Sequence, residues 1–408
     1  MNQHVTLHHP SGILKGSIKL PASKSEANRA LIIAALSGQA SELENLSEAN
    51  DTQLLQRLLQ SDAQTVNAED AGTVMRFLTA YYAITGQQKT LVGTERMCQR
   101  PIKVLVEALR ELGARITYVG EEGFPPLKIE GFSENGSNKL KIRSDISSQY
   151  ISALLMVAPL LPEGLALELE GKIGSRPYIE MTLSLMQHFG VSADFTGNTI
   201  TVPHQQYKAA RFSVESDWSA ASYWYSMVAL AKEAEITLLG LKEHSFQGDR
   251  AVVEIMNRLG IYTSFSAEGV TLTKKHHEKH VAFDFSDCPD LAQTVVALCA
   301  AKGITLELTG LESLRIKETD RIQALQIEVL SMGASLEEIS PGVFRMEPVI
   351  LTKKELCFRT YQDHRMAMAF APLALLEPVQ IQEPSVVRKS YPRFWEDLEK
   401  VGFDVITN

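Results

Sequence analysis

One signal recurs along the chain at a nearly constant spacing. An amphipathic segment ends in an apolar residue and a glycine, and a strand-like run follows. Glycine at this position is typical of a helix that ends in the left-handed conformation. Successive copies lie about 70 residues apart, and such a period indicates an internal structural repeat. The copies are Leu112-Gly113-Ala114, Phe189-Gly190-Val191, Leu259-Gly260-Ile261, Met332-Gly333-Ala334 and Val401-Gly402-Phe403.

Each period also holds an earlier helix that starts with small polar residues, as at Ser216-Asp217-Trp218-Ser219. The repeat therefore predicts the order strand–helix–strand–helix–strand–strand, in which the last two strands form a hairpin. One such hairpin is expected to join Val191–Asp194 to Thr199–Val202 through a turn at Gly197-Asn198. About six copies fill the chain. The first copy is short by roughly 15–20 residues, so we expect its hairpin to be missing and one sheet edge to be truncated.

Grouping the copies predicts an α/β protein of two lobes. One lobe holds residues 20–213, and the other holds residues 214–408 together with residues 1–19. No Gly/Ser-rich linker marks either crossing, so the phase of the repeat alone sets these boundaries.

The acidic composition narrows the class of partner. A net charge of -9 and a sequence pI near 5.7 argue against nucleic acid. The longest apolar run, residues 151–161, is too short to span a bilayer. The four cysteines are scattered without paired spacing, which fits a reducing compartment. These features, with a polar N-terminus, predict a cytoplasmic protein with no membrane partner.

Cations gather at a few expected helix starts. The segment Leu314–Arg321 holds three cations and two carboxylates just ahead of an apolar-periodic helix. Thr319 or Asp320 is expected to cap that helix, and Arg321 then lies in its first turn, where it opposes the helix dipole. Such a start suits an anion that binds free backbone N–H groups and fixed positive charge. A solvated charge run is the alternative interpretation.

The same design recurs near the N-terminus. Ser23 and Glu26 form a capping-box pattern for a helix whose first turns contain Lys24, Ser25 and Arg29. Two cations near the positive end of a helix are unfavourable unless an anion binds there. A capped surface helix is the alternative for this motif taken alone.

Further segments place arginines, acids or hydroxyl donors at expected helix starts. Arg100-Pro101 and Arg176-Pro177 each put an arginine before a proline at the first helical position. Asp290 also lies at a helix start, where it is either a cap or a functional carboxylate. The remaining segments of this kind are Asp70–Arg76, Ser147-Ser148-Gln149, Asp363–Ala369 and Arg388–Pro392.

Other signals favour no further chemistry. His276–His280 is dense in histidine, but two lysines precede it, so a hairpin loop is favoured over a metal site. No Walker or dinucleotide glycine-rich fingerprint and no Gly-x-Ser-x-Gly elbow is present.

Taken in order, these segments resemble the 5-enolpyruvylshikimate-3-phosphate synthase family from about Leu20 to Trp395. The matching motifs are Pro21–Arg29, Ala71–Arg76, Arg100-Pro101, Ser147-Ser148-Gln149, Lys317–Arg321 and Asp363–Met368. The resemblance implies a two-lobed inside-out α/β barrel of βαβαββ repeats, with helix N-termini facing the cleft between lobes. It also implies transfer of the enolpyruvyl group of phosphoenolpyruvate to the 5-hydroxyl of shikimate 3-phosphate, with release of phosphate, on the pathway to chorismate and aromatic amino acids.

The resemblance also assigns roles to residues of this chain. It implies that Asp290 is the base toward the 5-hydroxyl, and that Glu318 and Lys24 handle protons at the methylene carbon and the departing phosphate. The implied contacts of phosphoenolpyruvate are Lys24, Gly72, Arg100, Gln149, Arg321, Arg365 and Lys389. The implied contacts of shikimate 3-phosphate are Lys24, Ser25, Arg29, Ser147, Ser148, Gln149, Ser175, Tyr178, Asp290, Ser313 and Lys317.

The chain departs from the family pattern at Asp70, Phe77 and Ser313, where Asn, Pro and Asn are frequent or found in some relatives. Gly72 is retained, which favours sensitivity to the herbicide glyphosate.

We expect no cofactor and no metal, because fixed cations neutralise the substrate anions. Separate large cores suggest a monomer.

Two rival functions remain at this point. The first is the sister enolpyruvyl transferase that acts on UDP-N-acetylglucosamine, which uses a loop cysteine further upstream of its Arg-Pro than Cys98 lies here. The second is a non-catalytic protein that binds an anionic metabolite. Such a protein is expected to have lost a proton-handling residue, but Lys24, Asp290, Glu318 and Lys389 are all present.

Overall fold

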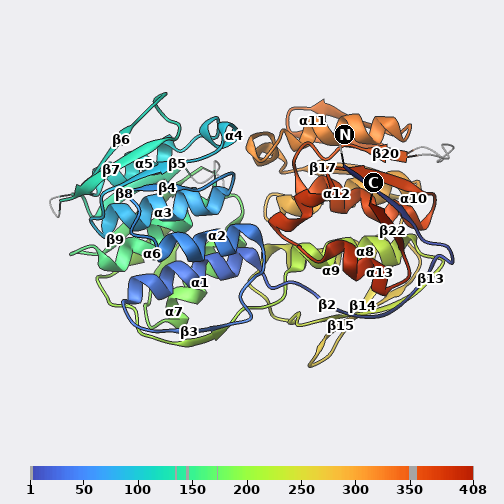
Figure 1. The fold of residues 1–408 in the computed structure, drawn as a ribbon, viewed down its shortest axis with the longest axis horizontal. Coiled ribbons are helices and arrows are strands. Elements are labelled where there is room, and N and C mark those ends of the chain that lie inside the picture. The colour runs from blue at the N-terminus through green and yellow to red at the C-terminus, as the bar shows by residue number, and fades with distance from the viewer. Residues whose placement is uncertain (1–2, 134–135, 144–146, 172, 349–355, 408) are drawn as a thin grey trace. The chain divides into compact units, whose positions relative to one another are not determined.

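The computed structural model describes residues 3–133, 136–143, 147–171, 173–348 and 356–407 (Figure 1). The chain divides into two compact units, each with a hydrophobic core of its own. The N-terminal unit contains Ser23–Ser47 and Asp51–Val214. The C-terminal unit contains Met1–Ala22, Glu48–Asn50 and Glu215–Asn408. The phase of the repeat did not predict that Glu48–Asn50 belongs to the C-terminal unit.

The C-terminal unit is built from three copies of one βαβαββ repeat. In each copy the first two strands are parallel, and the fourth strand lies between the second and the third. The first copy comprises β2 (Ile13–Lys19), α8 (Trp218–Leu230), β13 (Glu233–Leu239), α9 (Val252–Arg258), β14 (Ile261–Phe265) and β15 (Gly269–Lys274). The second comprises β16 (His280–Asp284), α10 (Ala292–Lys302), β17 (Thr305–Thr309), α11 (Arg321–Ser331), β18 (Ser335–Ser340) and β19 (Val343–Glu347). The third comprises β20 (Leu356–Phe358), α12 (His364–Phe370), β21 (Val379–Gln382), α13 (Phe394–Lys400), β22 (Asp404–Thr407) and β1 (His4–His8).

The N-terminal unit repeats this topology twice in full and once in part. One full copy comprises β4 (Thr65–Asn67), α3 (Gly72–Ile84), β5 (Lys89–Val92), α5 (Lys103–Glu111), β6 (Ala114–Tyr118) and β7 (Leu127–Phe132). The other comprises β8 (Lys139–Arg143), α6 (Ser148–Val157), β9 (Leu165–Glu170), α7 (Arg176–His188), β10 (Asp194–Thr196) and β11 (Thr199–Val202). The partial copy comprises β12 (Arg211–Ser213), α1 (Lys24–Ser37), β3 (Glu42–Glu44) and α2 (Asn50–Leu59).

The partial copy lacks a hairpin. Among the described residues, β3 and β12 form a parallel two-stranded sheet, whereas each of the other repeats has four strands. The chain runs from α2 to β4 with only a few residues between them. A truncated first repeat was predicted, because Leu59, at the end of its second helix, precedes Gly113 by only 54 residues.

The ends of the chain close two sheets of the C-terminal unit. Strand β2 pairs in parallel with β13 along its whole length, and Figure 1 shows it in blue near the later β13, β14 and β15. Strand β1 lies between β21 and β22. These pairings bring the N-terminus into the C-terminal unit.

Helices occupy the interior of each unit, and sheets lie outside them. In α8, α10 and α12 almost every residue is buried, and the same holds for α3 and α6 in the N-terminal unit. A helix that is apolar on all sides is buried by neighbours on all sides. Several candidate site residues lie at the starts of these buried helices, among them Gly72 of α3, Ser148 of α6 and Arg365 of α12.

The glycine signals mark helix ends as predicted. Gly113 and Gly190 have φ angles of 108° and 84°, and Gly260, Gly333 and Gly402 are also left-handed. A side chain at Gly113 would in addition collide with the Ser133 carbonyl, since an added Cβ lies 2.0 Å from that oxygen. Glycine is required there both for its conformation and for its small size.

Two local predictions were wrong. The first strand of the predicted hairpin is β10 at Asp194–Thr196, because Val191 closes the α7 terminus by donating its N–H to the Met186 carbonyl. Arg100-Pro101 does not start a helix: α5 begins at Lys103, after the short helix α4 (Glu95–Cys98). Short 3-10 turns complete the secondary structure at Ala158–Leu160, Gly248–Ala251, Pro289–Leu291, Glu312–Ile316, Ala371–Leu375 and Pro384–Lys389.

Candidate active site

The C-terminal unit contains a buried ionic cluster centred on Arg321, the first residue of α11. Its guanidinium donates to Asp363 at 2.6 Å, to Asp290 at 2.8 Å and to Glu318 at 2.9 Å. Arg321 is 2% exposed. Asp320 caps α11 by accepting from the N–H groups of Ile322 and Gln323, so the helix start is fixed independently of Arg321.

Asp290 contacts several cations of this cluster. Arg365, in the first turn of α12, donates to Asp290 at 2.8 Å, and the Lys317 ammonium lies 3.8 Å from it. Burial alone would raise the pKa of Asp290, but Arg365, Lys317 and Arg321 overcome this and hold it well below its usual range. Asp290 belongs to a 3-10 turn and pairs with these cations instead of capping a helix.

Glu318 links the cluster to Lys389. The Lys389 ammonium lies 3.6 Å from one oxygen of Glu318, while the other oxygen accepts from Arg321. Lys389 is the last residue of a 3-10 turn, and its side chain is almost fully buried. The unit thus brings together six of the predicted site residues: Asp290, Lys317, Glu318, Arg321, Arg365 and, at the edge of the cluster, Lys389. Ser313 lies in the 3-10 turn ahead of Lys317.

In the N-terminal unit, two arginines converge on the start of α3. An added Cβ at Gly72 would lie 2.8 Å from Arg76 and 2.9 Å from Arg100, so both guanidinium groups cover this residue. Arg100 donates to the Asp70 carbonyl at 3.4 Å, and its buried Nε has no hydrogen-bond partner among the described residues. The N-cap residue Ala71 offers no side-chain acceptor. Free N–H groups beside two guanidinium groups suit an anion.

The start of α1 carries Lys24, and that of α6 carries hydroxyl groups. The Lys24 ammonium contacts the buried carboxylate of Asp51 at 2.9 Å. Ser23 caps α1 by accepting from the Glu26 N–H, as the capping-box pattern predicted. Ser147 caps α6 by accepting from the Gln149 N–H, and Ser148 is the first residue of that helix.

Arg29 is enclosed within the N-terminal unit. Its guanidinium donates to Thr182, to Ser152 and to the Ser25 carbonyl at 2.8–2.9 Å, and it lies over the Phe77 and Tyr178 rings. Arg29 is 1% exposed, and burial lowers its pKa to about 10. These contacts make Arg29 a support for the start of α1, so its assignment as a direct ligand of shikimate 3-phosphate stays a prediction. Ser175, with a φ of 54°, precedes α7.

Comparison with known proteins identifies the family. The family model described as EPSP synthase (3-phosphoshikimate 1-carboxyvinyltransferase) matches residues 9–61 and 55–398. This chain belongs to the EPSP synthase family. A Bacteroides fragilis 3-phosphoshikimate 1-carboxyvinyltransferase is 50% identical over 404 residues, and the match covers 98% of each chain. Proteins of the same name from Sulfurovum and Idiomarina loihiensis are 36% and 34% identical, covering 96% and 95% of this chain.

Solved structures of this family share the fold. An EPSP synthase from Acinetobacter baumannii superposes with a TM-score of 0.78 at 19% identity, and both chains are covered completely. The match supports the two-lobed α/β architecture that the repeat pattern predicted.

Several residues of these clusters were not assigned to the site from the sequence. Asp51 pairs with Lys24, and Arg76 lies beside Gly72, although the sequence marks Arg76 only as part of a motif. Asp249 and Ser219 lie behind Arg365. The signal for Asp249 is weak, because one acid after Gln247-Gly248 at a short turn resembles an ordinary cap.

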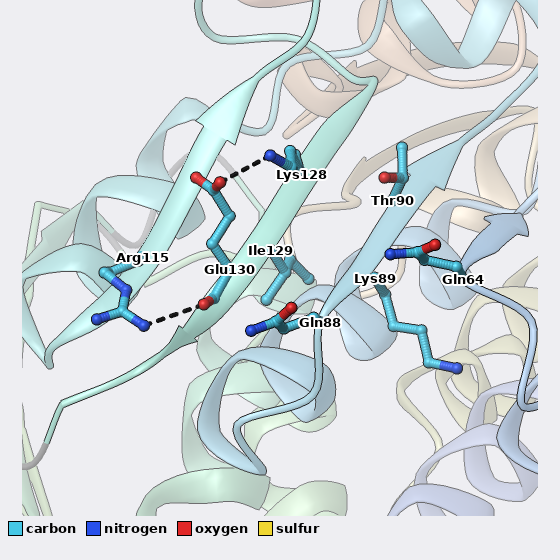
Figure 2. A pocket seen from close by; sticks show the side chains of 8 residues that line it. All are labelled: Gln64, Gln88, Lys89, Thr90, Arg115, Lys128, Ile129 and Glu130. Carbon is cyan, nitrogen blue, oxygen red and sulfur yellow. Dashed lines mark hydrogen bonds and ion pairs between the residues drawn. The ribbon is translucent and has the colours of Figure 1, made fainter.

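A surface pocket lies apart from the predicted residues (Figure 2). It is formed over strands of the N-terminal unit by Gln64, Gln88, Lys89, Thr90, Arg115, Lys128, Ile129 and Glu130. Figure 2 shows Glu130 paired with Lys128, while Arg115 donates to the Glu130 carbonyl. The Lys89 ammonium donates hydrogen bonds to the carbonyls of Ser61 and Ala63. The pocket therefore offers little unpaired charge, and none of the predicted site residues lines it.

Two further features bear on partners. Within the described part of the chain, no helix is both long and apolar enough for a membrane crossing. No group of three His, Cys, Asp or Glu side chains among those residues is arranged to hold a metal ion.

Proposed function

We propose that this chain transfers the enolpyruvyl group of phosphoenolpyruvate to the 5-hydroxyl of shikimate 3-phosphate and releases phosphate. Membership of the EPSP synthase family supports this reaction. The single structural observation that carries the proposal is the ionic cluster of the C-terminal unit. In it, Arg321 and Arg365 contact the carboxylates of Asp290 and Glu318, so anion-binding and proton-handling groups share one network.

The cluster suits an exchange of partners. A substrate carboxylate or phosphate offers Arg321 and Arg365 a bidentate acceptor of the same geometry as Asp290 and Glu318. When the arginines bind that acceptor, the two side-chain carboxylates lose cation contacts, and their pKa values rise toward the usual range. A carboxylate held by three cations is a weak base. Substrate binding therefore makes Asp290 and Glu318 better proton acceptors.

The reaction then proceeds by addition and elimination. Asp290 takes the proton of the 5-hydroxyl as the hydroxyl oxygen bonds to the central carbon of phosphoenolpyruvate. Glu318, which takes up a proton from solvent once its pKa has risen, gives that proton to the methylene carbon. The resulting tetrahedral intermediate returns a proton from the new methyl group to Glu318 and expels phosphate, which restores the carbon–carbon double bond. Lys24 donates to the departing phosphate. Asp290 then gives its proton to solvent and Lys24 regains one from solvent, so atoms and charge balance without an oxidant or a reductant.

We assign the N-terminal unit to the remaining anionic groups. Arg100 and Gly72 at the start of α3 contribute to binding phosphoenolpyruvate, supported by the guanidinium groups and free N–H groups there. Ser147, Ser148 and Gln149 at the start of α6, with Ser25, Ser175 and Tyr178, contribute hydroxyl and amide donors to shikimate 3-phosphate. Ser313 and Lys317 complete that set from the C-terminal unit.

Phosphate release by the purified protein tests the proposal. We expect release only when phosphoenolpyruvate and shikimate 3-phosphate are both present. Release with UDP-N-acetylglucosamine in place of shikimate 3-phosphate would assign the chain to the sister reaction. Binding of phosphoenolpyruvate without release in either mixture would favour a non-catalytic binding protein.

The finer assignments of location and assembly are also proposals. The scattered cysteines support a cytoplasmic location. Each unit buries an extensive core within one chain, which supports a functional monomer. Sedimentation at several protein concentrations measures the assembly state directly, and a mass of twice the 45.2 kDa chain at micromolar concentration contradicts a monomer.

A further inference from the structure

Behind Arg365 lies a carboxyl group that the reaction scheme does not use. Asp249 is 2% exposed and belongs to the 3-10 turn Gly248–Ala251. One of its oxygens accepts a hydrogen bond from the Ser219 hydroxyl, and Ser219 in turn accepts from Arg365 at 3.4 Å. The other oxygen, Oδ1, is buried without a hydrogen-bond partner among the described residues. Asp249 and Arg365 are thus linked through one hydroxyl.

We propose that Asp249 is a positioning residue that acts through Ser219 to orient Arg365 for the carboxylate or phosphate of phosphoenolpyruvate. The inference rests on the proposed function, because it concerns how that substrate is held. Ser219 has one hydroxyl proton, and Asp249 accepts it. The lone pairs of Ser219 therefore remain directed toward Arg365. This contact holds the guanidinium when Asp290 gives up its own contact with Arg365.

The charge on Asp249 decides how well this arrangement works. Its surroundings include Asp290 from the turn before α10, Asp217 at the start of α8, Arg365 from α12 and the thiol of Cys288. On its own turn, Arg250 is directed to the Glu243 carbonyl and to Glu254. Burial, and next the charge of Asp290, raise the pKa of Asp249 to about 7, against the opposing effects of Arg365 and Ser219.

Two consequences follow from this environment. In the neutral form, Asp249 adds no anion to the cluster and leaves the charge of Arg365 for the substrate. In the ionised form, it competes with the substrate for Arg365. Phosphoenolpyruvate should therefore bind more weakly as the pH rises through the pKa of Asp249.

The substitution Asp249→Asn isolates this effect, because it keeps the shape and an acceptor for Ser219 but cannot ionise. We expect the KM for phosphoenolpyruvate of the wild type to match that of the variant at pH 6. At pH 8.5 we expect the wild-type KM to be higher by roughly tenfold, the size of a unit charge acting across a few ångströms of partly screened protein. The ratio of the two KM values cancels the titration of phosphoenolpyruvate itself.

Glu328→Gln is the matched control. Glu328 is a second buried carboxyl of the same unit whose pKa burial raises, but it accepts from Tyr361 and from the Arg359 N–H. Its variant should follow the wild-type profile at every pH. Ser219→Ala provides the second test, because it removes the bridge: the KM should rise at all pH values. At pH 6, where Asp249 is mostly neutral, adding Asp249→Asn should then change nothing further.

The outcomes separate the alternatives. Parallel KM profiles for the wild type and Asp249→Asn overturn the inference, and so does an equal loss of kcat at every pH with an unchanged KM. Calorimetric titration with phosphoenolpyruvate distinguishes the two levels of proposal. A wild type that binds phosphoenolpyruvate without turnover contradicts the proposed function alone, since the variants' affinities still test the positioning. A wild type that does not bind it contradicts both.

Discussion

The two units hold the candidate arginines at their helix starts in different ways. In the C-terminal unit, Arg321 and Arg365 are neutralised by side-chain carboxylates of the same unit. In the N-terminal unit, Arg100 contacts a backbone carbonyl at the start of α3, where Ala71 supplies no side-chain cap. A carbonyl carries only a partial charge, so Arg100 keeps more of its attraction for an incoming anion.

This difference assigns different tasks to the two units. The start of α3 in the N-terminal unit is organised to receive an anion directly, because its first N–H groups lack a side-chain cap and lie beside the guanidinium groups. The C-terminal unit must first release carboxylates, and those released carboxylates are the groups proposed to move protons. Binding in the first unit is then mainly electrostatic attraction, whereas binding in the second also prepares the chemistry.

The largest expected effect concerns a carboxylate of the C-terminal unit. Glu318→Gln keeps an acceptor for Arg321 but removes the proton-transfer group, so kcat should fall by about 10²–10⁴-fold. The affinity for shikimate 3-phosphate, measured by calorimetry, should stay within a few-fold of the wild type. The control Glu312→Gln changes an exposed acid of the adjacent 3-10 turn and should leave kcat unchanged. If Glu318→Gln keeps full kcat, the carboxylates of this unit serve only to neutralise cations, and the assignment of separate tasks fails.

The next effect concerns the anion site of the N-terminal unit. Gly72→Ala places a methyl group 2.9 Å from Arg100 and 2.8 Å from Arg76, and these side chains must shift. We expect the KM for phosphoenolpyruvate to rise by roughly 10–100-fold, equivalent to about 1.4–2.8 kcal/mol, with a smaller change in kcat. Inhibition by glyphosate, if it competes for the same anion site, should weaken in parallel.

Gly120→Ala is the matched control for this substitution. An added Cβ there meets only Pro126 at 3.8 Å, which is ordinary contact, and the backbone is not left-handed. An unchanged KM in Gly72→Ala would show that the start of α3 does not hold phosphoenolpyruvate.

A smaller expected effect is the dependence of the unfolding free energy on pH that Asp249 of the C-terminal unit causes. Burial raises the pKa of Asp249 from 3.8 to about 7, so the folded state binds this proton more tightly than the unfolded state. The stabilising contribution is complete below pH 3.8 and is lost as the pH rises through 7. Compared with Asp249→Asn, the wild type should lose on the order of 3–4 kcal/mol of unfolding free energy between pH 4 and pH 7.5. Urea unfolding of both proteins across this range measures the difference, and a constant difference contradicts the raised pKa.

The repeats could be predicted from the sequence because the apolar residue and glycine that end each second helix form a local signal. A left-handed glycine such as Gly190 ends the second helix of five repeats, so the spacing of these glycines records the topology directly. The missing hairpin followed from the same count. The start of α5 was misplaced because proline at a first helical position is common but not obligatory, and here Arg100-Pro101 lies in the connection from α4.

The candidate site was predictable only in part. Residues such as Arg321 were noticeable because a cation at a helix start lacks a local reason. The pairings between these residues were not predicted, since Asp363 serves as a cap of α12 and also pairs with Arg321 across 42 positions of sequence. Asp249 was missed for a related reason. Its role depends on burial and on the neighbours Ser219 and Arg365, which come from distant parts of the chain.

The smallest expected effects concern the capped start of α11 and the start of α3, which has no side-chain cap. Asp320→Ala removes two hydrogen bonds to the first N–H groups of α11 and should lower the unfolding free energy by about 1 kcal/mol, with the KM for phosphoenolpyruvate nearly unchanged. Ala71→Ser does the reverse at α3: the new hydroxyl caps the helix and should add a few tenths to about 1 kcal/mol. That hydroxyl competes with the substrate for the same N–H groups, so the KM should rise several-fold. Urea unfolding and steady-state kinetics of the two variants measure both quantities. A stabilised Ala71→Ser protein with an unchanged KM would mean that the bare start of α3 is not where the anion binds.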